Sequence, residues 1–141
     1  MKLGPLQWVR ATAVLLVVLL LAGCFTKRKN EGARLYSQRC ASCHGENGEG
    51  LRRLIPPLAG SDYLGEHRSS LPCQLRKGLA GEITVNGVKY NQLMPGNESL
   101  TDSEITNLLN YVQSSWGNKG EVWTIREVAD ELKYCGGARG L

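Results

Sequence analysis

The motif Cys40-Ala41-Ser42-Cys43-His44 constrains this chain more than any other stretch. Its two thiols stand three positions apart, so both lie on one side of a single helical turn. This C-x-x-C-H pattern is typical of c-type haem attachment, in which each thiol bonds to one vinyl group of the same porphyrin. The imidazole of His44 would then lie under the ring as the first axial ligand of the iron. The motif therefore predicts one covalently bound haem c, attached through Cys40 and Cys43.

Two other kinds of site use paired cysteines and are kept as alternatives. A structural zinc site needs four ligands, usually as two separated pairs, and no second C-x-x-C follows in the sequence. A thioredoxin-like redox pair is expected in a βαβ context, and no strand is predicted before Cys40. The sequence therefore favours haem over both.

Residues 1–23 have the features of a signal peptide. Lys2 and Arg10 provide positive charge, and the mostly aliphatic run over 11–22 is too short to span a bilayer comfortably. The run ends in Leu21-Ala22-Gly23-Cys24, which resembles the lipobox of bacterial lipoproteins. That resemblance implies a lipid on Cys24, a membrane tether over 24–30, and an extracytoplasmic location on the periplasmic side of a bacterial membrane. An uncleaved signal anchor is the alternative.

The five cysteines divide by role. If Cys24 takes lipid and the haem motif takes two more, Cys73 and Cys135 are left. In an oxidising compartment two such cysteines are more often paired than free, and a bridge here would join the end of the chain to its middle. Two buried thiols that never meet are the alternative.

Charge says less about function. The 141 residues carry a net charge of +4, and residues 1–23 contribute two basic and no acidic groups, so the remainder is close to neutral. This balance argues against binding to nucleic acid. The short basic run Lys27-Arg28-Lys29 is expected to lie near anionic lipid headgroups or simply in water.

The first half of the remaining chain is expected to form short helices around a long loop. A helix is predicted from Asn30, as its N-cap, through Cys40. Glycines and prolines make 45–60 a loop that wraps around the cofactor. Further helices are predicted to begin at Ser61 and at Ser70, the second of them ending at a glycine.

The second half has sharper signals. Asn86-Gly87 stands between two β-prone triplets and predicts a small hairpin packed on the haem region. Thr101-Asp102-Ser103-Glu104 is a capping box, and the apolar residues that follow at helical spacing predict a helix through Trp116. A second capping box at 124–127 predicts a further helix in an extension that ends at Cys135.

The second axial ligand has two candidates. Beyond residues 1–23, Met94 is the only methionine, and His67 is the only histidine besides His44. Met94 precedes a proline in a loop well separated from the C-x-x-C-H motif, which suits the opposite face of the ring, whereas His67 lies in a hydrophilic stretch typical of a surface. The sequence favours Met94, with a plain core methionine as the alternative role.

Together these features resemble class I cytochromes c, most of all the bacterial lipoprotein members and the cytochrome domains of periplasmic dehydrogenases and oxidases. The resemblance covers about residues 30–118 and rests on the C-x-x-C-H-G run, the Pro56-Pro57-Leu58 turn, Met94-Pro95 and the closing helix. It implies an all-α class I cytochrome c fold with crossing N- and C-terminal helices around one haem, plus a small β-hairpin. The domain would span 31–118, followed by a C-terminal helical extension over 119–141.

The resemblance also implies roles for individual residues. His44 and Met94 would be the axial pair, and Cys40 and Cys43 the thioether anchors. The carbonyl of Pro56 would accept a hydrogen bond from the His44 imidazole. In the helix crossing, Gly32 would lie against Tyr111.

The expected function is a membrane-tethered carrier of single electrons between extracytoplasmic redox partners, which is not catalytic by itself. A fixed subunit of a larger respiratory or dehydrogenase complex is an alternative, favoured by the extension after Gly120. A haem enzyme or sensor with an open iron, in which Met94 is only core, is a third. Hydrolytic or nucleotide chemistry is not indicated, because no serine–histidine pairing and no phosphate-binding loop with lysine is present.

Overall fold

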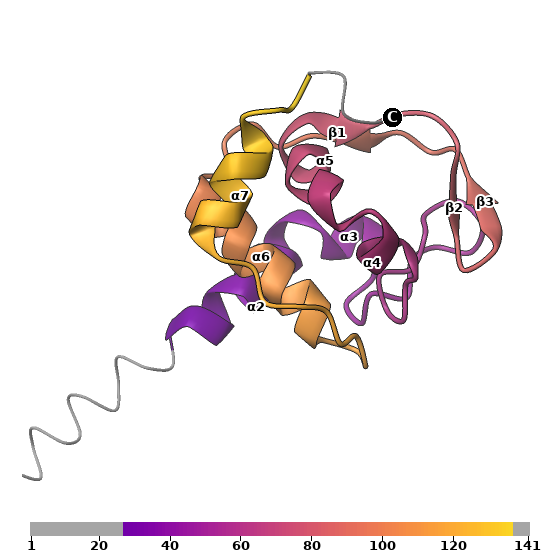
Figure 1. Ribbon diagram of the computed structural model, residues 1–141. Coiled ribbons are helices and arrows are strands. Elements are labelled where there is room, and N and C mark those ends of the chain that lie inside the picture. Colours follow the sequence, from indigo (N-terminus) through magenta and orange to yellow (C-terminus); the bar gives the residue numbers. More distant parts are fainter. Residues whose placement is uncertain (1–26, 137–141) are drawn as a thin grey trace, which may run out of the picture.

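The computed structural model describes residues 27–136, with side chains from Glu31 onward. It is mostly helical, with two small two-stranded sheets at its periphery (Figure 1). The predicted signal peptide over 1–23, the predicted lipid attachment site Cys24 and the end of the extension lie outside the described residues. The elements in chain order are α2 (Lys27–Arg39), α3 (Ala41–His44), α4 (Tyr63–Glu66), the 3₁₀ helix η1 (Arg68–Ser70), α5 (Leu71–Lys77), β1 (Gly78–Leu79), β2 (Ile83–Val85), β3 (Val88–Tyr90), β4 (Met94–Pro95), α6 (Asp102–Ser114) and α7 (Ile125–Leu132).

The crossing of α2 over α6 is the largest contact between two elements. At the crossing, the backbone of Gly32 lies against α6, where a Cβ on Gly32 would meet the carbonyl oxygen of Asn107 and lie 2.7 Å from Cβ of Tyr111. The predicted pairing of Gly32 with Tyr111 is therefore confirmed. Leu35 and Ile105 are buried nearby, and each such side chain stabilises the fold by about 1.5–3 kcal/mol.

The limits of α2 differ from those predicted. The described chain is already helical at Lys27, so Asn30 lies within the helix and is not its N-cap. It ends at Arg39, although the N–H of Cys40 still donates to the carbonyl of Tyr36 at 2.8 Å. The chain then starts the short helix α3, so Cys40 lies at the junction of the two helices and Cys43 lies within the second.

The predicted hairpin is present as β2 and β3, and the strands pair in antiparallel register, with Val85 opposite Val88. Asn86 and Gly87 both have positive φ, as a tight hairpin turn requires. Asp62 and Asn86 exchange two hydrogen bonds, each side chain accepting from the other's backbone N–H. This exchange explains why the prediction of Ser61 as a helix cap is wrong: α4 begins at Tyr63, and the side chain of Asp62 holds the hairpin turn instead of capping the helix.

Helix α5 has the proline in its first turn and ends at Gly78, as predicted. No sequence pattern indicates that the chain continues from α5 directly into a strand. Gly78 and Leu79 form β1, which pairs with β4 so that Leu79 lies opposite Met94. Met94 is therefore held in a short strand and not in a loop.

Helix α6 opens with the predicted capping box between Thr101 and Glu104. It ends at Ser114, so the prediction that it continues through Trp116 is wrong. Trp116 adopts a positive φ of 49° beyond the helix, a conformation that is uncommon for large residues. Its ring packs 4.8 Å from that of Tyr36 and against the backbone of Gly48, and this contact accounts for the helix end.

The C-terminal extension folds back on the domain. Its helix α7 opens with the second predicted capping box, and Val128 is completely buried. Cys135 is bonded to Cys73 of α5, so the predicted disulfide is confirmed and the alternative of two separate thiols is not. Within residues 27–136, no helix combines the length and apolar character needed to cross a bilayer.

The helix crossing can be tested at Gly32. An exposed helical glycine replaced by alanine gains up to about 1 kcal/mol. At Gly32 the added methyl group overlaps α6, so we expect Gly32→Ala to lower the free energy of unfolding by about 1–3 kcal/mol in urea denaturation. Gly65→Ala is the control, because no heavy atom lies within 4 Å of its Cβ position and stability should be unchanged or higher. Equal changes at both positions would contradict the close approach.

Candidate functional site

An apolar cleft, partly open to solvent, lies between the helices and the hairpin of the domain and has a cavity volume of about 90 Å³. Its walls come from α4, α5, α6 and the hairpin, and nearly all of the lining side chains are apolar. His44 and Met94 both line this cleft, and so does Cys40. The fold therefore brings together three of the four residues predicted to bind haem.

His44 ends α3 and is 9% exposed. Its Nδ1 lies 3.1 Å from the carbonyl oxygen of Pro56, which can only accept, so Nδ1 carries the proton and Nε2 keeps its lone pair. Burial lowers the pKa of His44, outweighing the opposite effect of the hydrogen bond to Pro56. A neutral, oriented imidazole with a free Nε2 is the form that binds a metal. The hydrogen bond that the resemblance implied at Pro56 is present.

The carbonyl of Pro56 is itself held in place by the loop around it. The N–H groups of Leu58 and Ala59 both donate to the carbonyl of Gly48, at 2.8 and 2.9 Å. A Cβ on Gly50 would lie 2.8 Å from the Pro56 oxygen, so a larger residue there would displace it.

Asn118 ties this loop to the end of α6, and sequence reasoning missed it. Its Nδ2 donates to the carbonyls of Leu58 and Val112, and its Oδ1 accepts from the N–H of Gly60. No local pattern marks such a residue, because its partners lie up to 60 positions away.

The two motif cysteines are unpaired, whereas the other two described cysteines form a disulfide. Burial is the main cause that raises the pKa of Cys40 to about 11. Redox-active pairs of the thioredoxin kind have a lowered thiol pKa, so this environment does not favour that alternative. In the described part of the chain, no three His, Cys, Asp or Glu side chains gather as a zinc site would require.

Tyr36 supports the motif from α2. Its hydroxyl donates to the carbonyl of Gly45 at 2.6 Å, directly after His44. Burial raises the pKa of Tyr36, so the phenol stays protonated and keeps this bond. Tyr36 is 1% exposed, so it belongs to the buried core on which α3 lies.

The remaining predicted residues lie outside the cleft wall. His67 stacks on Tyr63 with ring centroids 3.9 Å apart, is exposed, and does not line the cleft, in agreement with the preference for Met94. Cys43 is exposed on α3, one helical turn from the lining residue Cys40. Polar groups at the cleft were not predicted: the side-chain amide of Gln74 donates to the hydroxyl of Tyr63 at 2.9 Å.

These observations fit a haem. The cleft is apolar, as a porphyrin requires, and a nitrogen donor and a thioether donor both face the same space. The thiols of Cys40, at the start of α3, and Cys43, within α3, are unpaired and available for covalent attachment.

Comparison with known proteins agrees with this geometry. The family model for cytochrome c matches residues 30–116. Cytochrome c-552 of Thermus thermophilus is 37% identical over 123 residues, which are 84% of this chain and 82% of that protein. The cytochrome c subunit of a quinone alcohol dehydrogenase from Gluconacetobacter polyoxogenes is 36% identical over 90 residues, 62% of this chain and 19% of that one.

Both the family match and the Thermus relative span the C-x-x-C-H motif and the helix crossing, and the mostly helical fold with its small hairpin agrees with the class I architecture. The chain therefore belongs to the cytochrome c family, as a class I c-type cytochrome with one covalently bound haem c.

Proposed function

We propose that this cytochrome carries single electrons between extracytoplasmic redox partners while tethered to a membrane. The observation that carries the proposal is the placement of His44 and Met94 on one apolar cleft. With a protein ligand for each axial position, no site would be left open for oxygen, peroxide or substrate. This arrangement suits an electron carrier better than an enzyme or a gas sensor.

Each residue has a defined task in this proposal. His44 supplies Nε2, and the carbonyl of Pro56 holds the imidazole in the required tautomer and orientation. Met94 supplies its thioether sulfur from β4, and Cys40 and Cys43 supply the thiols for covalent attachment. Bound haem would supply the iron, whose change between ferrous and ferric states accounts for the electron carried.

The cleft walls surround the two proposed axial donors with mostly apolar side chains. Leucine, isoleucine and valine side chains from α5, α6 and β2 line it, and they are fixed by the packed core behind them. A thioether opposite an imidazole in such surroundings favours ferrous iron and raises the reduction potential. Packed walls also limit the movement that accompanies electron transfer.

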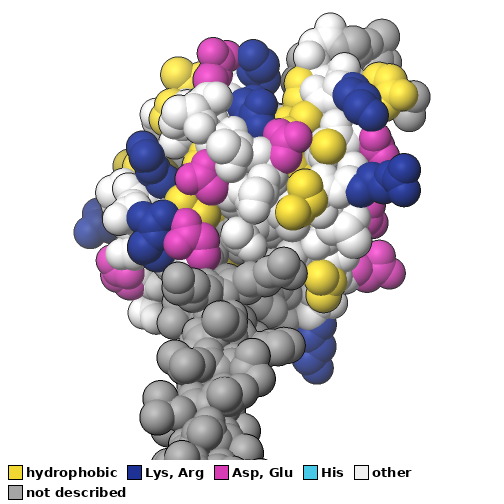
Figure 2. Space-filling model, turned by 90° about the vertical axis from the view of Figure 1, so that its left-hand side faces the viewer, with side chains coloured by type: hydrophobic (Ala, Val, Ile, Leu, Met, Phe, Trp, Pro, Cys, Tyr) yellow, Lys and Arg dark blue, Asp and Glu magenta, His cyan; other side chains and the backbone are white. Residues whose placement is uncertain are grey.

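Partners would dock weakly and briefly. Leu93 precedes Met94 and is 64% exposed, and Leu54, in the loop that leads to Pro56, is 58% exposed. Exposed apolar side chains next to both ligand-bearing segments suit a small transient interface. On the face of the molecule that carries α2 and α7, basic and acidic side chains are intermixed (Figure 2). Neither sign of charge therefore dominates the electrostatic potential of this face.

Tethering rests on the sequence. Cys24, which lies outside the described residues, ends the lipobox-like run Leu21-Ala22-Gly23-Cys24, and the basic run over 27–29 follows within a few residues. One lipid-bearing cysteine with nearby positive charge provides the two signals that stable anchoring requires.

A fixed subunit of a larger dehydrogenase is the second candidate. Three relatives carry the name of an alcohol dehydrogenase cytochrome c subunit, each matched over 19% of its length. In the extension, Val122 and Ile125 are more than half exposed although Val128 of the same segment is buried. Co-purification in mild detergent separates the two: a stoichiometric dehydrogenase partner favours the subunit, and a lone cytochrome favours the carrier.

The axial assignment is tested with Met94→Ala. We expect loss of the far-red band that reports methionine bonded to ferric iron. The reduction potential should also fall by a sizeable part of the roughly 0.8 V range that axial ligands set. His67→Ala is the control and should retain both properties, because His67 is exposed and does not line the cleft. A far-red band that survives in Met94→Ala would refute the assignment.

The tether is tested with Cys24→Ser in the full-length chain expressed in a bacterium. We expect the haem-containing protein to move from the membrane fraction to the soluble fraction if the signal peptide is still cleaved, or to stay as an uncleaved anchor with a higher mass. Mass spectrometry of the parent N-terminus should show a lipid-modified Cys24. An unmodified Cys24 in the parent would contradict lipidation.

A further inference from the structure

The segment that carries Met94 is built onto the end of α5. Leu79, two residues beyond the helix, pairs with Met94 across β1 and β4. After the strand, the N–H of Asn97 donates to the carbonyl of Leu75 at 2.9 Å. The Met94 strand is therefore bound to β1, which continues α5, and the residue Asn97 after it is bound to α5 itself. The strand moves only if α5 moves or these bonds break.

The two backbones touch without intervening side chains. A Cβ on Gly96 would lie 2.6 Å from the nitrogen of Gly78 and 2.7 Å from the oxygen of Arg76. A Cβ on Gly78 would in turn lie 2.5 Å from the oxygen of Met94. Because the two backbones are in direct contact, a displacement of α5 would also displace Met94.

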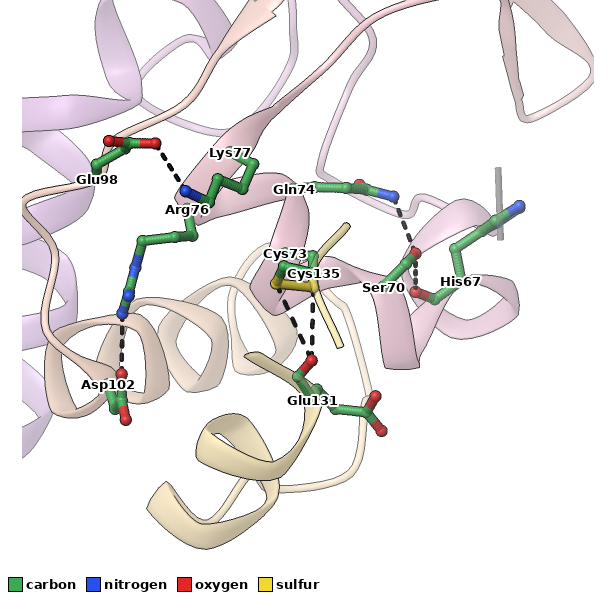
Figure 3. The surroundings of a disulfide bond; sticks show 10 residues. All are labelled: His67, Ser70, Cys73, Gln74, Arg76, Lys77, Glu98, Asp102, Glu131 and Cys135. Atoms are coloured by element: carbon green, nitrogen blue, oxygen red, sulfur yellow. Dashed lines mark hydrogen bonds and ion pairs between the residues drawn. A yellow bond between two sulfur atoms is a disulfide. The ribbon is translucent and has the colours of Figure 1, made fainter. Parts of the chain in front are cut away.

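Two ion pairs add to this connection, as Figure 3 shows. Arg76 pairs with Asp102 at the start of α6, at 2.9 Å, and Lys77 pairs with Glu98 in the segment after Met94, at 2.8 Å. Both cations lie in the last turn of α5. The second pair is well exposed and contributes little by itself.

Helix α5 is also bonded to the C-terminal extension. Cys73 joins Cys135 just beyond α7, and the carbonyl oxygen of Glu131 lies 3.6 Å from the sulfur of Cys73 (Figure 3). The two cysteines are 62 positions apart, so the disulfide bond ties α5 covalently to a segment that is far from it in the sequence. Cys73 precedes β1 by only one and a half helical turns.

The extension is itself anchored to the rest of the domain. Asn110 of α6 binds the backbone of Trp123 twice, donating to its carbonyl at 3.0 Å and accepting from its N–H at 2.7 Å. The guanidinium of Arg68 lies 3.8 Å above the Trp123 ring, which is 4% exposed. The disulfide therefore connects α5 through α7 to α6, the helix that also forms a wall of the cleft.

We propose that Cys73 and Cys135 are positioning residues for the methionine ligand: their disulfide fixes α5, and α5 fixes the strand that holds Met94 in the cleft. The proposal rests on the proposed role of Met94 as axial ligand. It goes further by assigning the extension a task in ligand retention, in addition to the stability that any long-range disulfide confers. Opening of the Met94 segment should be a local event that the disulfide suppresses.

The test uses the full-length, haem-loaded protein and the Cys73→Ala/Cys135→Ala double variant. Imidazole is mixed with the ferric protein under native conditions, and the loss of the far-red band is followed in time. Imidazole binds only when the methionine leaves, so its limiting rate reports opening of the Met94 segment. We expect this rate to rise about tenfold in the double variant.

A matched control separates this role from general stability. Ile105→Ala removes buried side-chain volume from α6 at a position that does not line the cleft. For each variant a temperature is chosen at which the denaturant concentration at half-unfolding has fallen by the same amount. The imidazole-binding rates are then compared at these temperatures. The proposal predicts a rate within about twofold of the parent for Ile105→Ala. An unchanged rate in the double variant, or an equal rise in both, would overturn it.

A second measurement avoids variants that fold poorly. Carbon monoxide uptake by the ferrous protein is compared after ascorbate, which reduces only the iron, and after dithiothreitol. This dithiol transfers two electrons and two protons to the disulfide, which gives two thiols and the cyclic disulfide of the reagent. Thiol alkylation followed by mass spectrometry verifies the cleavage. Faster uptake after cleavage supports the proposal, and equal uptake overturns it.

The parent protein distinguishes failure of this proposal from failure of the axial assignment. If the parent shows no far-red band, Met94 is not the ligand and both proposals fall. If the band is present, and the rates of imidazole binding and carbon monoxide uptake do not change when the disulfide is removed, only the positioning role is refuted.

Discussion

The close crossing of α2 and α6 is the constraint on which the other features depend. Gly32 allows the two backbones to meet, and the Leu35 and Tyr36 side chains then pack into the core beside α6. Because α2 leads directly into α3, this crossing sets where Cys40 and His44 lie. Because α6 supplies one wall of the cleft, it also sets how wide that cleft is. A methyl group added at Gly32 would push α2 away from α6 and so displace the haem attachment motif.

The two proposed axial donors are supported in different ways. His44 is held by local structure: its partner Pro56 is twelve residues away, in a loop closed by glycines and by Asn118. Met94 is held by distant structure, through two-residue strands, backbone contact with α5 and a covalent bond to the extension. The imidazole side is thus held mainly by a loop close to it in the sequence, with Asn118 as one distant contact. The thioether side depends on parts of the chain that only the complete fold brings together.

Sequence reasoning succeeded where one residue type has one strong physical preference. The C-x-x-C-H motif, the turn at Asn86-Gly87 and both capping boxes are of this kind, and the Cys73–Cys135 pair followed from counting cysteines. It failed where a residue had to choose between partners. The side chain of Asp62 binds the hairpin turn and not its own helix, Trp116 leaves α6 for an aromatic contact, and β1 and β4 are too short to show any periodicity. Such choices are decided by tertiary contacts that no local window contains.

The disulfide closes residues 73–135 into a ring, and Met94 lies inside that ring while Cys40, Cys43 and His44 lie outside it. A protease that cuts the peptide chain once within the ring, for example at the exposed tip of the hairpin, leaves two fragments that are still joined by sulfur. The methionine segment would then stay attached to the part of the protein that carries the haem. A nicked molecule would thus keep both proposed axial ligands and both motif cysteines on one covalent framework.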